Sequence, residues 1–143
     1  MNKANIDWFI LDSDEYIQDT ELYLGSFTSD SSIEIIIQIW NNRYGLEEVE
    51  SIENARLSMK FDSFEDSTLF NYCSVKVNNS DVDLDLIANK AIINIGSLSG
   101  QINDGIDNAG NRDNYKDITI KFSNFPSSLK NGLKNLYLNI END

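Results

Sequence analysis

The stretch "SSIEIIIQIW" (residues 31–40) repeats apolar side chains with a period of two, which is the signature of a β-strand. One face of this strand carries Ile33, Ile35, Ile37 and Ile39. The opposite face carries Glu34, Ile36, Gln38 and Trp40. Because both faces are apolar near the middle, we expect the strand to be covered on both sides there.

The same alternation returns toward the C-terminus in stretches separated by turn residues: "ARLSMKFD", "TLFNYCSVKV", "DVDLDLI", "AIINIGSL", "DITIKF" and "LKNLYLNI". Short alternating strands at near-regular spacing predict an all-β fold. We expect a mainly antiparallel β-sandwich, Ig-like or jelly-roll, of about eight strands with at most one short helix. Residues 46–55 ("LEEVESIENA") have some helical spacing, but an extended connection with an edge strand explains them equally well.

A chain of 143 residues fits one domain. Residues 1–30 have a weaker and more acidic pattern than the rest, so we predict an N-terminal arm there and the β-sandwich domain over residues 31–143. The alternative is that "DWFIL" and "ELYLGSF" add one or two strands. Neither a signal-peptide core nor a run of about 20 apolar residues is found, so no leader or membrane span is expected.

The net negative charge of the chain limits the classes of partner that it can bind. The 24 Asp and Glu outnumber the 11 Lys and Arg, which gives a formal charge of −13 and an isoelectric point near 4.2. Such a field repels nucleic acids and anionic membrane surfaces, and it suits a basic partner. We therefore predict protein partners, with no nucleic acid and no membrane.

Catalytic machinery is not recognisable in the sequence. The chain has no histidine and a single cysteine, Cys73, which we expect to be a buried strand residue. The sequence contains no Walker motif and no dinucleotide-binding motif. The stretch nearest to a nucleophile elbow, "GSLSG" (residues 96–100), has Leu98 where the nucleophile would stand. We predict a protein that is not an enzyme, without catalytic or cofactor-binding residues.

The stretch "GQINDGIDNAGNRDNY" (residues 100–115) is the most unusual loop of the chain. Asp104, Asp107 and Asp113 are weak candidates for calcium ligands, but no register satisfies the EF-hand pattern. No cofactor is therefore predicted, and calcium remains the one alternative. Because the loop is longer than an ordinary hairpin connection, we expect a mobile tip or a contact surface that a partner orders.

The predicted partner-binding residues lie mainly in this loop. They are Asn103, Asp104, Asp107, Asn108 and Asn111, together with two aromatic residues beside turns, Phe64 and Phe125. Aromatic side chains near turns are typical anchors of protein interfaces when they are exposed, and burial in the core is the alternative for each of the two.

Residues 35–62 ("IIIQIWNNRYGLEEVESIENARLSMKFD") resemble Ig-like β-sandwich modules of tailed-phage virion proteins and bacterial surface proteins. The match is carried by Asn41, Asn54, Ala55, Leu57, Met59 and Phe61. The insertion "LEEVESIE" is longer and more acidic than the pattern of these modules. The resemblance implies a building or binding module, and it transfers no functional residue.

These observations together predict a structural or accessory virion protein, a phage capsid or tail component that docks on a larger assembly through its loops and a sheet edge. It would be made in the host cytoplasm and reside in the virion, and self-association stays open. One alternative is an acidic immunity or inhibitor protein that neutralises a basic toxin. Another is a carbohydrate-binding module.

Overall fold

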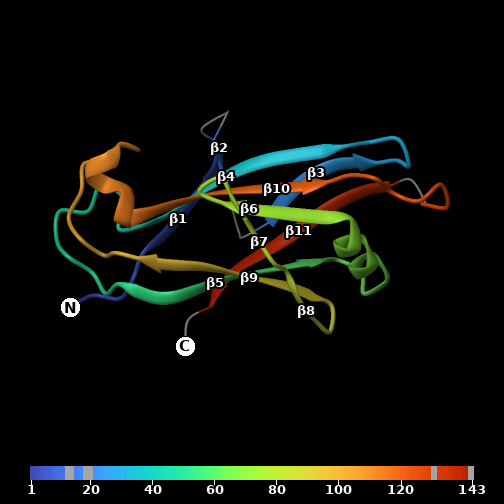
Figure 1. Cartoon of the computed structure of the whole chain (residues 1–143). Helices are drawn as coiled ribbons and strands as arrows, with labels where there is room; N and C mark the ends of the chain where they lie inside the picture. The colour runs from blue at the N-terminus through green and yellow to red at the C-terminus, as the bar shows by residue number, and fades with distance from the viewer. Residues whose placement is uncertain (12–14, 18–20, 130–131, 142–143) are drawn as a thin grey trace.

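Two antiparallel sheets face each other in the computed structural model, which describes residues 1–11, 15–17, 21–129 and 132–141 (Figure 1). The six-stranded sheet has the order β2 (Glu15–Tyr16), β1 (Ile6–Ile10), β4 (Ile33–Asn41), β10 (Tyr115–Phe122), β6 (Cys73–Val77), β7 (Ser80–Val82). The five-stranded sheet has the order β3 (Glu21–Phe27), β11 (Gly132–Glu141), β5 (Ile52–Phe61), β9 (Lys90–Leu98), β8 (Asp85–Ile87). The predicted antiparallel β-sandwich is confirmed.

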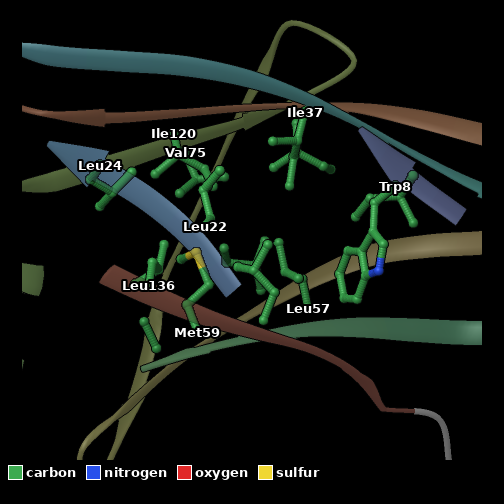
Figure 2. Close-up of a cluster of buried hydrophobic side chains, with 14 of the residues drawn as sticks. Trp8, Leu22, Leu24, Ile37, Leu57, Met59, Val75, Ile120 and Leu136 are labelled. Atoms are coloured by element: carbon green, nitrogen blue, oxygen red, sulfur yellow. The ribbon is translucent and has the colours of Figure 1, made fainter. Parts of the chain in front are cut away.

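The core lies between the sheets and is built from the alternating apolar positions. Figure 2 shows Leu57 and Met59 of β5 beneath Ile37 of β4, with Trp8 of β1 closing one side. Toward the end that carries the β3–β4 connection, the core consists of phenyl rings in mutual contact: Phe27, Phe61, Phe70, Phe122 and Phe125. In the alternating stretch "ARLSMKFD", Leu57, Met59 and Phe61 form the apolar face and are buried.

The first 30 residues contribute the strands β1 and β2 to one sheet and β3 to the other, and in the described ranges they form no separate arm. Strand β1 pairs with β4 over its whole length, and β3 pairs with β11. Trp8, Leu22 and Phe27 of this segment are buried in the common core. Burial of such large apolar side chains is favourable, and this holds the segment on the sandwich.

Two short 3₁₀ helices interrupt the strands, η1 (Glu65–Tyr72) and η2 (Ala109–Asn114). The sequence predicts a strand over "TLFNYCSVKV", from Thr68, but the strand begins only at Cys73. The first part of this stretch belongs to η1, which places the adjacent Leu69 and Phe70 in the same core. Residues 46–51 form the extended connection of the second predicted alternative, but the strand that follows, β5 from Ile52, lies between β11 and β9 and is not the expected edge strand.

The acidic stretch "DVDLDLI" is divided between the sheets. Strand β7 ends the six-stranded sheet at Val82, and the chain then crosses to β8, which begins at Asp85 in the five-stranded sheet (Figure 1). Asp81 and Asp85 therefore do not share one strand face, as a continuous strand would require. None of the helices in the described ranges is long and apolar enough to cross a membrane.

Candidate functional site

The β4–β5 connection (residues 42–51) and the β9–β10 connection (residues 99–114) meet at one end of the sandwich (Figure 1). Backbone hydrogen bonds join them, from Val49 N to Gly100 O at 3.0 Å, and the N-terminal segment is attached through Glu50 N to Asn2 O at 2.9 Å. We call residues 1–5, 42–51 and 99–114 the asparagine end. Helix η1 lies at the opposite end.

Buried asparagine side chains hold these loops together. Asn42 Nδ2 donates to Glu47 O at 2.8 Å, Gly100 O at 2.9 Å and Gln101 O at 3.3 Å. Asn42 also has a φ of 60°, a left-handed conformation that asparagine tolerates better than most residues. A carboxamide is a short side chain that can donate to several loop carbonyls at once, and a carbonyl has two lone pairs, so it can accept from the amide beside any backbone N–H.

Asn114 and Asn41 make the same kind of link deeper in the structure. Asn114 is fully buried and donates from Nδ2 to Ser99 O at 2.9 Å, Gln101 O at 3.0 Å and Asn41 O at 3.3 Å. Asn41 Nδ2 donates to the main chain of the loop beside it, at Glu50 O, over 2.9 Å. Its Oδ1 accepts from Asn5 N at 2.9 Å. The N-terminal segment and both loops are thus connected through side-chain amides.

Tyr44 stands on this framework in a strained conformation. Its φ is 60°, which is rare for a bulky side chain. Tyr44 N donates to Asn103 Oδ1 at 3.1 Å, and the ring lies so close to Gly105 that a Cβ at that position would fall 2.2 Å from it. Gly105 has a φ of +75°, so both the contact and the backbone require glycine here. Tyr44 nevertheless remains 57% exposed.

A second, smaller apolar cluster lies on the outer face of the six-stranded sheet. Phe9, Trp40 and Tyr115 are buried there, and Trp40 stacks on Tyr115 with 4.6 Å between ring centroids. The Arg43 guanidinium covers the cluster, 4.4 Å from the Phe9 ring and 4.9 Å from the Tyr44 ring. The apolar outer face predicted for the strand at residues 33–41 is therefore covered by loops of the same chain.

Gln38 fixes the long loop over this outer face. It is buried, and its Nε2 donates to Asp117 Oδ1 at 2.8 Å and to Asp107 Oδ2 at 3.4 Å. Its Oε1 accepts from Trp40 Nε1 at 2.7 Å. The pKa of Tyr115 is raised, mainly because the side chain is partly buried and to a smaller extent because the carboxylates of Asp117 and Asp107 are near. The loop therefore bends back onto the sheet instead of projecting away from it.

The predicted loop residues are brought together, but mainly by bonds to their own loop. Asp104 accepts from Asn111 Nδ2 and from Ile106 N, and these hydrogen bonds, that of Asn111 first, lower the pKa of its carboxyl. Asn108 caps η2 by accepting from Gly110 N. The loop length therefore has a third explanation besides a mobile tip or ordering by a partner: the fold itself orders it.

The three candidate calcium ligands do not form a group. Asp104 and Asp107 accept hydrogen bonds from amide side chains, and Asp113 is exposed on η2. Within the part of the chain that the structure describes, no cluster of three or more His, Cys, Asp or Glu side chains could hold a metal ion.

The two predicted aromatic anchors have different outcomes. Phe64 is 69% exposed at the start of η1. Phe125 is only 8% exposed, with its ring centroid 5.2 Å from that of Phe27 and 5.9 Å from that of Tyr72. The prediction of an exposed anchor at Phe125 was wrong, because the turn that contains it folds over the phenyl cluster of the core.

The exposed apolar side chains of the asparagine end were not identified from the sequence. They are Met1, Tyr44, Leu46, Ile102 and Ile106, each more than half exposed. Their signal is an apolar residue inside an otherwise polar loop, in "RYGLEE" and "QINDGIDN". We call Tyr44, Leu46, Ile102 and Ile106 the apolar patch.

Comparison with protein-family models, with curated proteins and with solved structures found no match.

Proposed function

We propose that this protein is a non-catalytic docking module that binds a protein assembly through the apolar patch. One observation supports this most directly: two loops expose four large apolar side chains while buried asparagines hold the loop backbones in place. A surface fixed before binding loses little conformational entropy when the partner arrives, which leaves more of the contact free energy for affinity.

The chemistry of the site favours recognition over catalysis. The carboxylates nearest the loops accept hydrogen bonds from amides, as at Asp104 and Asp107, and serve to shape the loop. The single thiol, Cys73, lies away from this end, and burial raises its pKa to about 12. A thiol with such a pKa holds its proton at neutral pH and is a poor nucleophile.

As the finer form of this proposal, the assembly is a virus particle, and the chain is an accessory component of a phage capsid or tail. Support comes from the resemblance of residues 35–62 to Ig-like virion modules together with the sandwich fold. Within that stretch, Ala55, Leu57 and Met59 are buried core positions, so the resemblance concerns the scaffold and not the patch.

A second candidate function is inhibition of a basic toxin. The observation that favours it is the formal charge of −13, because opposite fields speed association between an inhibitor and its target. This candidate uses the same patch and differs in the partner, a single basic protein instead of a particle.

Sedimentation of the tagged chain from the cells that produce it tests the proposal. We expect the chain to sediment with large particles, and the double variant Leu46→Ser/Ile102→Ser to remain at the top of the gradient. The matched control, Tyr23→Ser/Leu133→Ser, changes exposed apolar residues outside the asparagine end and should sediment like the unchanged chain. Sedimentation with one basic protein would favour the inhibitor. Sedimentation that is equal for both double variants would contradict docking through the patch.

A further inference from the structure

The charge around the apolar patch narrows the chemistry of its partner. Residues 42–51 and 99–114 carry six carboxylates against two arginines. The acidic side chains are Glu47, Glu48, Glu50, Asp104, Asp107 and Asp113, all in exposed positions. Of the arginines, Arg43 lies over the Phe9, Trp40 and Tyr44 rings, and its Nε donates to Gly105 O at 3.0 Å.

With both arginines counted against the six carboxylates, the two loops carry a formal net charge of −4. The guanidinium of Arg43 is directed at rings of its own chain, so Arg112 is the arginine of these two loops that remains exposed. The same two loops thus present exposed apolar side chains together with a net negative charge.

Tyr44 is the best-defined anchor of the apolar patch. Its left-handed backbone has an energetic cost that Asn103 and Gly105 compensate through a hydrogen bond and a ring contact. These contacts hold one side of the ring and leave Tyr44 57% exposed, and Leu46, two residues further along the chain, is 91% exposed. A tyrosine fixed in this way contributes contact area with little loss of side-chain entropy on binding.

We infer that the apolar patch binds a basic protein surface, in which an apolar pocket takes Tyr44 and Leu46 while lysine or arginine side chains face the surrounding carboxylates. This inference rests on the proposed docking function and specifies its partner. A second copy of this chain would bring the same carboxylates together, and nucleic acids or anionic lipids would be repelled in the same way.

Selection from a library of random peptides tests the partner chemistry directly. The library is selected on the immobilised full chain, and the enriched peptides are then measured against two variants of the patch. Tyr44→Asn removes the ring but keeps a residue that accepts a positive φ, and Leu46→Ser removes the most exposed apolar side chain of the patch. Tyr23→Asn and Leu133→Ser are matched controls, since these residues are 59% and 69% exposed on β3 and β11.

We expect the enriched peptides to carry net positive charge together with aromatic or aliphatic residues. Their affinity should fall about thirtyfold in Tyr44→Asn, the effect of losing a hot-spot side chain, and stay unchanged in the controls. The double variant Glu47→Gln/Glu48→Gln should weaken them several-fold and flatten their dependence on salt, whereas Asp30→Asn/Glu65→Gln should not.

The possible results distinguish a failure of the basic-partner inference from a failure of the proposed docking function on which it rests. Peptides that depend on Tyr44 and Leu46 but are neutral or acidic would overturn the basic partner and leave docking through the patch intact. If no enriched peptide depended on Tyr44 or Leu46, both the inference and the proposed docking site would be wrong. The melting temperature of every variant is measured as well, so that a loss of affinity can be distinguished from unfolding of the variant.

Discussion

Replacing Asn114 by alanine should destabilise the protein strongly, although the residue lies next to a surface loop. The side chain is fully buried, and its Nδ2 reaches the carbonyls of Ser99, Gln101 and Asn41. Its Oδ1 accepts from Gln101 Nε2 at 3.1 Å. An amide has only two N–H groups, so the three acceptors share two donors, and the side chain accounts for about three hydrogen bonds in all.

The magnitude follows from these contacts. At about 1 kcal/mol for each hydrogen bond, Asn114→Ala should lower the free energy of unfolding by about 3 kcal/mol. The carbonyl of Gln101 keeps Asn42 and Asn103 as donors, which prevents a larger loss there. For a domain of this size, about 3 kcal/mol corresponds to a decrease of roughly 10 °C in melting temperature.

Urea denaturation of the wild type, Asn114→Ala and Asn139→Ala measures the effect. Asn139 is an exposed residue of β11, so its truncation should change the free energy of unfolding by no more than about 0.5 kcal/mol. If Asn114→Ala cost less than about 1 kcal/mol, as an exposed asparagine would, the amide network would not be what holds the two loops together.

Three further predictions concern Gly105, the two candidate aromatic anchors and the thiol. Gly105→Ala should lower the free energy of unfolding, followed by thermal melting, by about 2 kcal/mol or more, because its φ is +75° and the added Cβ meets the Tyr44 ring. In the control Gly110→Ala the added Cβ meets only a side-chain atom, at 3.3 Å, so the loss should be smaller. Phe125→Ala should cost about 3 kcal/mol or more, and Phe64→Ala no more than about 0.5 kcal/mol; equal values in urea denaturation would contradict the burial of Phe125. Cys73, whose pKa burial raises from 9.0 to about 12, should react with a thiol reagent at pH 9.0 roughly a hundredfold more slowly when folded than in urea. Above pH 9.0 the unfolded chain loses this proton first, so the free energy of unfolding should fall as the pH rises.

The sandwich was predictable because burial of one face imposes strict alternation. Strand β5 follows it, with Leu57, Met59 and Phe61 inward. The prediction failed where this rule does not apply. In η1 the adjacent Leu69 and Phe70 are both buried, whereas neighbouring strand residues point to opposite faces. That adjacency was a signal against a strand at residues 68–72.

The asparagine end was only partly predictable. The sequence singles out the 100–115 loop, but the contacts that shape it join residues far apart, such as Asn42 to Gly100 across 58 positions and Asn114 to Asn41 across 73. A local pattern cannot encode such pairings. The sequence predicts Asn103 and Asn111 as partner-binding residues, whereas in the structure their amides donate to carbonyl groups of their own chain.

At four positions of the long loop, burial is the inverse of what side-chain polarity alone predicts. Asn111 and Asn114 are buried there, while Ile102 and Ile106 are more than half exposed. A single exposed isoleucine is ordinary on a protein surface, and a single buried asparagine is ordinary where loop carbonyls need donors. The two together are different, because the amides that fix the backbone also prevent the isoleucines from turning inward. The loop thus remains folded with its apolar side chains in water, an arrangement whose cost a bound partner would recover by covering them.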